Sequence, residues 1–205
     1  MRVLCFGDSN TWGYIPGTGG RYASDVRWTG VLKQLTGFEV IEEGLNGRTT
    51  AFTDAVEPYR SGLDYIAPCV MSQMPLDYIV LMLGTNDTKT RYHVSASEIR
   101  RSMGEVVWRI RDILGRQGSK AQLLLVAPPF LKAQSDFEDF DAQSEQKILR
   151  LEKEYEELAQ EMGCMFLKAG DYVKEMGVDG LHFTPGGHRA LAGAIAEKLN
   201  NMHEK

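Results

Sequence analysis

Short, continuous apolar runs alternate along this chain with longer segments of helical periodicity. Such runs are typical of strands whose two sheet faces are both covered. We identify five of them as strands, at residues 3–6, 39–41, 78–83, 122–127 and 165–167. Because strands alternate with helices and parallel crossovers are right-handed, the pattern predicts a three-layer α/β/α sandwich with a five-stranded parallel sheet of flavodoxin-like order.

The helical segments begin at recognisable signals. The clearest helix starts at Ser95, and Glu98 three residues later completes a capping box ahead of one apolar stripe. The last helix starts at Thr184, with Pro185 at its first helical position. Further helices are expected over residues 143–162 and, from weaker patterns, near residues 26–35 and 62–74. The segment 128–142 is expected to be a long irregular loop, and such loops are usually functional.

Composition narrows the class of protein. A domain of 205 residues buries about 70% of its unfolded surface, so we expect one domain over residues 1–205. The balance of 23 Lys and Arg against 28 Asp and Glu gives a net charge of −5, which disfavours nucleic acid as a partner. The cysteines, Cys5, Cys69 and Cys164, are widely spaced and predict free thiols in a reducing compartment.

The apolar runs are all short. The run at residues 3–6 is too short for the core of a signal peptide. The longest run elsewhere, residues 79–83, falls well below the ~20 residues that cross a bilayer. We therefore expect a cytoplasmic protein with no membrane partner.

Polar residues and glycines follow the first three strands, where open parallel sheets bind ligands. Ser9, in the sequence Gly-Asp-Ser-Asn, stands at a strand-to-helix turn, although Thr11 replaces the last glycine of the elbow motif G-x-S-x-G. Gly44 and Gly47 follow the second strand and can turn backbone N–H groups toward the same edge, and spacing does not decide between them. Asn86 follows the third strand, where its amide can donate hydrogen bonds into the crevice.

Asp179 and His182 stand on one short loop ahead of the last helix. A carboxylate three residues before a histidine can hold one ring nitrogen so that the other faces the sheet edge. Each motif alone has an ordinary interpretation as a cap, a turn or a surface coincidence. Together they supply a nucleophile, a base, an orienting acid and oxyanion donors at one edge. This combination predicts a serine hydrolase site.

Four blocks of the sequence resemble those of the SGNH (GDSL-type) hydrolases. The blocks are GDSN with Ser9, GLNG with Gly47, GTND with Asn86, and DGLH with Asp179 and His182. The wider segments CFGDSNTWGY, DVRWTGVL, FEVIEEGLNGRTT, MLGTNDTK and DGLHFTPGGH resemble the bacterial arylesterase/acyltransferase subgroup. The likeness covers nearly the whole chain. Asn10 departs from the leucine of the GDSL motif, which alters no catalytic position.

The resemblance implies a serine esterase that hydrolyses short, acetyl-type esters without a metal or cofactor. It assigns Ser9 as the nucleophile, His182 as the general base and Asp179 as the orienting acid. The oxyanion hole is then formed by the N–H groups of Ser9 and Gly47 and by the Asn86 amide. Because a backbone donor requires only a small residue, Gly47→Ala is expected to be tolerated better than Asn86→Ala. Some members of the subgroup transfer the acyl group to alcohols or peroxide, and oligomers occur, so we expect a homo-oligomer acting on a small-molecule ester.

Candidate substrate contacts surround these motifs. Trp12, one helical step past the nucleophile, is a candidate wall of the substrate pocket or else a core residue. Asp87 and Lys89 are candidates for the rim, although solvated charge is the ordinary interpretation of Lys89. Phe130 lies in the long loop and is a candidate cap. The chain has no broad apolar insertion, so a short acyl group fits better than a long lipid.

Other functions fit the sequence less well. The four histidines include no HExxH motif or Cys/His cluster, and His188 is expected on a helix surface rather than at a metal site. A nucleotide-binding module would suit a doubly wound sheet, but neither GxxxxGK[ST] nor GxGxxG is present. A carbohydrate O-acetylesterase or an acyltransferase would use the same triad, and the sequence leaves that choice open.

Overall fold

The computed structural model describes residues 1–53, 55–133 and 139–203. Its centre is a parallel sheet of five strands in the order β2-β1-β3-β4-β5, which confirms the flavodoxin-like order expected from the sequence. The strands are β1 (Arg2–Gly7), β2 (Glu39–Gly44), β3 (Tyr78–Met82), β4 (Gln122–Ala127) and β5 (Met165–Lys168). The helices are α1 (Ser9–Trp12), α2 (Trp28–Thr36), α3 (Gly62–Gln73), α4 (Ala96–Arg116), α5 (Ala142–Glu161) and α6 (Pro185–His203).

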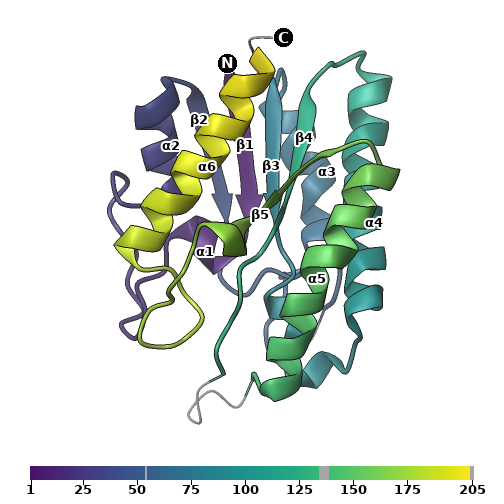
Figure 1. Cartoon of the computed structure of the whole chain (residues 1–205). Coiled ribbons are helices and arrows are strands. Elements are labelled where there is room, and N and C mark those ends of the chain that lie inside the picture. The colour runs from purple at the N-terminus through teal and green to yellow at the C-terminus, as the bar shows by residue number, and fades with distance from the viewer. Residues whose placement is uncertain (54, 134–138, 204–205) are drawn as a thin grey trace.

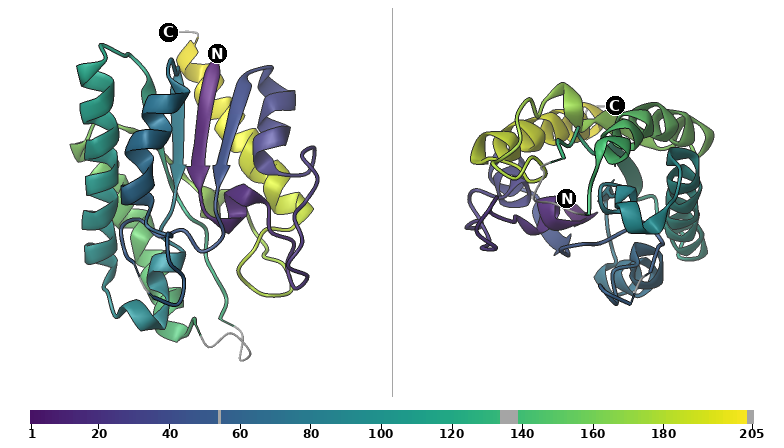
Figure 2. Two further views of the ribbon diagram at one scale, coloured as in Figure 1. Left: turned by 180° about the vertical axis from the view of Figure 1, so that it is seen from behind. Right: turned by 90° about the horizontal axis from the view of Figure 1, so that it is seen from below.

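Helices cover both faces of the sheet, as Figures 1 and 2 show. Helices α3, α4 and α5 pack on one face, where Leu4 and Phe6 of β1 join their apolar core. Helices α2 and α6 pack on the other, where the alternate residues Val3 and Cys5 join a second core. Both faces of β1 are therefore buried, which explains why its sequence is continuously apolar rather than alternating.

The helices begin where the sequence signals predict. The Ser95 hydroxyl accepts the Glu98 N–H at 3.3 Å, and the Glu98 carboxylate accepts the Ser95 N–H at 2.7 Å, which completes the capping box of α4. The loop expected at residues 128–142 precedes α5, although residues 134–138 lie outside the described residues. Within the described ranges, no helix has both the length and the apolarity to cross a membrane.

Strand β2 extends three residues beyond the predicted segment 39–41, as far as Gly44. The extension contains Glu42, whose charge hid the strand from an apolar pattern. The Arg27 guanidinium binds both oxygens of the Glu42 carboxylate, at 2.7 and 2.9 Å, and the Thr29 hydroxyl donates to it at 2.7 Å. These partners neutralise the charge, so the strand continues alongside β1 to its end.

The expectation that His188 lies on a helix surface is wrong. Its side chain is fully buried between α6 and α2, with its ring edge-on to the rings of Tyr22 and Phe183. Its Nδ1 accepts the Trp28 N–H at 3.2 Å, which satisfies a donor at the start of α2. Burial, aided by the charge of Arg27, lowers the pKa of His188 to about 4, so the ring is neutral at pH 7.

Candidate active site

The carboxyl ends of β1, β2 and β3 meet at one edge of the sheet, the lower edge in Figure 1. Ser9 follows β1 directly and is the first residue of α1. Asp8 caps this short helix, because its carboxylate accepts the Asn10 N–H at 2.9 Å. The chain leaves the helix through Gly13, whose φ of 88° lies in the left-handed region. The nucleophile candidate is thus held at a tight strand-to-helix turn.

His182 lies between Ser9 and Asp179, although the serine is 173 residues away in sequence. The His182 Nε2 is 2.9 Å from the Ser9 Oγ, and its Nδ1 is 2.8 Å from the Asp179 Oδ2. Asp179 Oδ1 also accepts the N–H groups of Leu181 and His182, each at 3.0 Å. Burial raises the pKa of Asp179, but the hydrogen bonds from His182 and Leu181 outweigh it and lower the pKa to about 2. The carboxylate is therefore ionised at neutral pH.

Asn10 connects the turn that carries Ser9 to the loop that carries His182. Its amide nitrogen donates to the Leu181 carbonyl at 3.3 Å, and its amide oxygen accepts the Phe183 N–H at 2.9 Å. The residue after Ser9 thus holds the backbone on both sides of His182. Sequence reasoning treated Asn10 only as a departure from a motif and missed this role. No local sequence signal indicates this role, because the Asn10 amide is buried only by the folded chain.

Tyr14 is a second residue that sequence reasoning missed. Its ring centroid lies 4.2 Å from that of the His182 ring, with 33° between the planes. The Tyr14 N–H donates to the Ser9 carbonyl at 3.0 Å, which places the ring beside the triad. An aromatic face at this distance restricts the orientation of the imidazole.

Gly47 and Asn86 lie on the loops that follow β2 and β3. The Asn86 amide donates one hydrogen to the Arg48 carbonyl at 3.1 Å. Gly47 sits in a turn that the Arg48 N–H closes by donating to the Leu45 carbonyl at 3.1 Å. Among the described residues, the N–H groups of Ser9 and Gly47 donate to no protein acceptor. Two backbone donors and the second Asn86 amide hydrogen therefore remain available for an oxyanion.

The Arg48 side chain holds the turn that contains Gly47 in place. Its buried guanidinium donates to the carbonyl of Gly7 at 2.9 Å and to the carbonyl of Glu43, and it lies over the ring of Phe6 at 4.1 Å. Burial lowers the pKa of Arg48, while the charges of Glu43 and other neighbours oppose this change. The side chain fastens the Gly47 turn to the ends of β1 and β2.

The structure changes what is expected of Gly47→Ala. Gly47 has a φ of +76°, so alanine there incurs about 1–2 kcal/mol of left-handed strain. We expect Gly47→Ala to lower both the melting temperature and kcat, whereas Asn86→Ala lowers kcat by about 10²–10³-fold with less effect on stability. Ester turnover and thermal unfolding of both variants measure this. The expectation from the sequence that Gly47→Ala is tolerated better than Asn86→Ala did not include this backbone conformation.

Gly37→Ala is the matched control for the strain. Gly37 ends α2 with a φ of +71°, and a Cβ added there meets no atom within 4 Å. Its alanine variant matches the left-handed backbone strain but not the crowding at Gly47, where a Cβ would lie 2.9 Å from the Glu57 Oε1, and it is expected to keep kcat. If Gly47→Ala lowers kcat no more than Gly37→Ala does, the strain at residue 47 does not displace the N–H, and the expected loss of kcat is contradicted.

Two of the candidate substrate contacts are placed differently from the prediction. Asp87 and Lys89 were expected at the rim, but both side chains are buried. The Lys89 ammonium pairs with Glu57 and lies 3.6 Å from the Asp139 carboxylate, so it is not a solvated charge either. These partners are distant in sequence, which is why the local pattern could not indicate them.

The other two candidates remain predictions. Trp12 is half-buried on α1, with the Arg21 guanidinium over its ring at 5.1 Å and the Tyr14 ring at 6.4 Å. Phe130 is half-buried in the loop after β4. Neither position is buried deeply enough to make the side chain purely a core residue.

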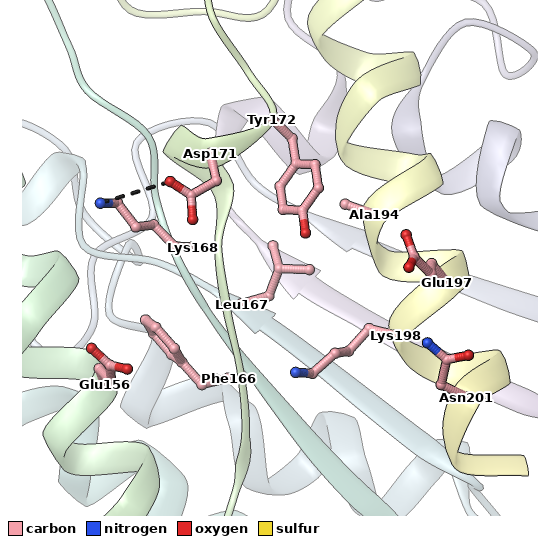
Figure 3. A pocket seen from close by; sticks show the side chains of 10 residues that line it. All are labelled: Glu156, Phe166, Leu167, Lys168, Asp171, Tyr172, Ala194, Glu197, Lys198 and Asn201. Atoms are coloured by element: carbon pink, nitrogen blue, oxygen red, sulfur yellow. Dashed lines mark ion pairs between the residues drawn. The ribbon is translucent and has the colours of Figure 1, made fainter.

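A cavity of about 500 Å³ lies elsewhere, along the β5 edge of the sheet. Figure 3 shows its side chains coming from α5, from β5 and the turn after it, and from α6, with Lys168 paired to Asp171. Its lining contains none of Ser9, Asp179 or His182. This cavity is separate from the hydrogen-bonded triad.

Comparison with known proteins gives this geometry a context. A family model described as the GDSL-like lipase/acylhydrolase family matches residues 5–190. The solved structure of a carbohydrate acetylesterase from Sinorhizobium meliloti has 37% identity and a TM-score of 0.93, over 98% of this chain and 99% of that one. The native aryl esterase of M. smegmatis has 39% identity and a TM-score of 0.91, over 98% of each chain. A search of curated protein sequences found no match.

Proposed function

Because the chain belongs to the GDSL-like lipase/acylhydrolase family and is a carboxylic ester hydrolase, we propose that it cleaves short, acetyl-type esters through an acyl-enzyme on Ser9. The observation that carries this proposal is the continuous chain of hydrogen bonds from Ser9 through His182 to Asp179, at 2.9 and 2.8 Å. Both distances lie within the range required of a nucleophile, its base and the group that orients the base.

Acylation begins at the serine hydroxyl. The ionised Asp179 accepts the Nδ1–H of His182, which leaves a lone pair on Nε2 facing the Ser9 hydroxyl. Ser9 Oγ forms a bond to the ester carbonyl carbon while Nε2 takes the hydroxyl proton. The carbonyl π electrons move to its oxygen, which the N–H groups of Ser9 and Gly47 and the Asn86 amide bind as an oxyanion.

The tetrahedral intermediate then collapses. The carbon–oxygen bond to the alcohol breaks, and the His182 imidazolium returns its proton to that oxygen. Asp179 stabilises the positive ring while it exists. Deacylation follows the same path with water as the nucleophile: Nε2 takes a proton from water while the water oxygen bonds to the acyl carbon. The bond from that carbon to Ser9 Oγ then breaks, the His182 imidazolium returns its proton to Oγ, and the acid is released.

The acceptor of the acyl group distinguishes a hydrolase from an acyltransferase. With 4-nitrophenyl acetate and benzyl alcohol in water, we expect release of 4-nitrophenol with acetate as the main product, because water is in large excess. Chromatography of the products measures the partition. Dominant benzyl acetate would make the protein an acyltransferase, and failure to release 4-nitrophenol above the uncatalysed rate would contradict the esterase proposal.

A carbohydrate O-acetylesterase is the second candidate. A specific observation favours it, since the neighbour from S. meliloti with a TM-score of 0.93 is a carbohydrate acetylesterase. The same triad and oxyanion donors serve an acetylated sugar hydroxyl as the leaving group. A kcat/KM for acetate release from peracetylated xylose above that for 4-nitrophenyl acetate would favour this candidate.

We further propose that the chain folds as one domain over residues 1–205 and forms a cytoplasmic homo-oligomer. Support for association comes from the resemblance to a subgroup in which oligomers occur. Val56, Tyr59 and Val178, which are 77%, 90% and 82% exposed, are candidate contacts for a second copy. Val56 and Tyr59 lie on the loop before α3, and Val178 lies on the loop before α6.

A further inference from the structure

Asp87 is a buried carboxylate that the mechanism above does not use. It is fully inaccessible to solvent and directly follows Asn86, in the short 3-10 helix η1 (Asn86–Thr88). One of its oxygens, Oδ1, accepts two hydrogen bonds from Thr50, one from the N–H at 2.8 Å and one from the hydroxyl at 2.5 Å. Its other oxygen, Oδ2, is buried without a hydrogen-bond partner among the described residues.

Ionisation of the Asp87 carboxyl is unfavourable in this setting. No cationic side chain in the described part of the chain pairs with Asp87. Burial raises its pKa to about 6 against the effect of the Thr50 hydrogen bonds, and the charge of Asp8 raises it further. An ionised carboxylate with a bare oxygen carries a desolvation cost. Stability alone therefore does not explain this residue.

The contacts of Asp87 connect two loops of the site. Thr50 belongs to the loop after β2 that carries Gly47, and Asp87 belongs to the turn after β3 that carries Asn86. The same two loops meet at a neighbouring point, where the Asn86 amide donates to the Arg48 carbonyl. Two adjacent residues of one turn thus bind two nearby residues of the other loop. This pair of attachments sets where the Asn86 amide lies relative to the Gly47 N–H.

We propose that Asp87 is a positioning residue of the oxyanion hole, which holds Asn86 in place by accepting both hydrogen bonds from Thr50. The proposal rests on the acyl-enzyme mechanism proposed above. Asp87 touches neither the ester nor Ser9 in this role. It acts through Asn86, whose amide must face the oxyanion, and a displacement of about 1 Å in such a group can cost about 10²-fold in rate.

The test is a cycle of variants assayed with 4-nitrophenyl acetate. Asp87→Ala is expected to lower kcat by up to about 10²-fold with KM near its normal value, because the oxyanion forms only after the ester binds. Asp87→Asn keeps an acceptor oxygen for Thr50 and is expected to restore most of kcat. In Asp87→Ala combined with Asn86→Ala, the loss is expected to fall well short of the product of the two single losses, since the group being positioned is gone.

A second pair of variants addresses the same contact from its other side. Thr50→Val removes one of the two donors and is expected to lower kcat less than Asp87→Ala does, while Thr50→Ser keeps the hydroxyl and restores kcat. If Asp87→Ala fails to fold, the two Thr50 variants still test whether the contact between Asp87 and Thr50 positions Asn86. Thr88→Val is the control: Thr88 is buried in the same turn, and its hydroxyl donates to the Thr85 carbonyl at 2.8 Å within that turn. It is expected to lose stability and keep kcat.

The outcomes separate the two proposals. If Ser9→Ala retains activity, the acyl-enzyme mechanism fails and the positioning role falls with it. If Ser9→Ala is inactive but the losses from Asp87→Ala and Asn86→Ala multiply, only the positioning role is overturned. The positioning role is also overturned if Asp87→Asn is as poor as Asp87→Ala, or if Asp87→Ala keeps full kcat.

Discussion

Replacing Ser9 with alanine is expected to lower kcat for 4-nitrophenyl acetate by about 10⁶-fold, the loss typical of a missing triad nucleophile. The variant has no oxygen to form the acyl-enzyme, and His182 Nε2 loses the hydroxyl that lies 2.9 Å away. Only the oxyanion donors and substrate binding remain to accelerate attack by water. Initial rates at saturating ester, corrected for uncatalysed hydrolysis, measure the effect.

The fold is expected to survive this change, because the Ser9 hydroxyl interacts with His182 and α1 is capped by Asp8. Circular dichroism and thermal unfolding check this point. Ser95→Ala is the matched control: its hydroxyl caps α4, so its loss is expected to cost about 1 kcal/mol of stability and leave kcat unchanged. Activity of Ser9→Ala above about 1% of normal would rule out Ser9 as the nucleophile.

Asp179→Asn is expected to lower kcat by about 10⁴-fold with the geometry of the site preserved. Asparagine can present an N–H to His182 Nδ1, which then becomes an acceptor and leaves the proton on Nε2. In that tautomer Nε2 cannot take the Ser9 proton. Because the pKa of Asp179 is about 2, its carboxylate stays ionised at any pH suited to the assay, so loss of activity between pH 7 and pH 5 must come from another group.

The same pKa has a consequence for stability. A carboxylate whose pKa falls on folding stabilises the folded state above its unfolded pKa, near 4, and this contribution disappears as pH falls toward 2. Asp179→Asn is therefore expected to flatten the acid side of the stability curve. Asp141→Asn is the control for kcat. Asp141 caps α5 far from the triad in sequence, its pKa is also lowered, and asparagine also caps helices, so this variant is expected to keep normal kcat. Normal kcat in Asp179→Asn would contradict the proposed role of Asp179.

Much of the fold followed from the sequence because its signals are local. Apolar runs, the Ser95 capping box and the helix start at Pro185 each act over a few residues, and the structure contains all of them. The extension of β2 was missed because Glu42 looks unsuited to a strand until Arg27 neutralises it. That pairing joins residues 15 apart, beyond the reach of a periodic pattern.

Errors at the site have the same physical origin. His188, Asp87 and Lys89 were expected near solvent because isolated charges and imidazoles favour water. All three are buried, and tertiary contacts replace part of the lost hydration: a backbone N–H for His188, Thr50 for Asp87, and carboxylates for Lys89. Among the described residues, His188 Nε2 and Asp87 Oδ2 remain without a hydrogen-bond partner. Such partners come from other elements, so burial of a polar residue cannot be read from its neighbours in sequence.

The sequence by itself determined the type and order of the elements and the edge at which the polar motifs gather. It could do so because the carboxyl ends of parallel strands share one edge. Tertiary structure alone decided the distances on which chemistry depends. Asn10 holds the backbone around His182, and Asp87 joins the loops of Asn86 and Gly47. These hydrogen bonds vary steeply with distance and link distant segments, so they exist only once the chain has folded.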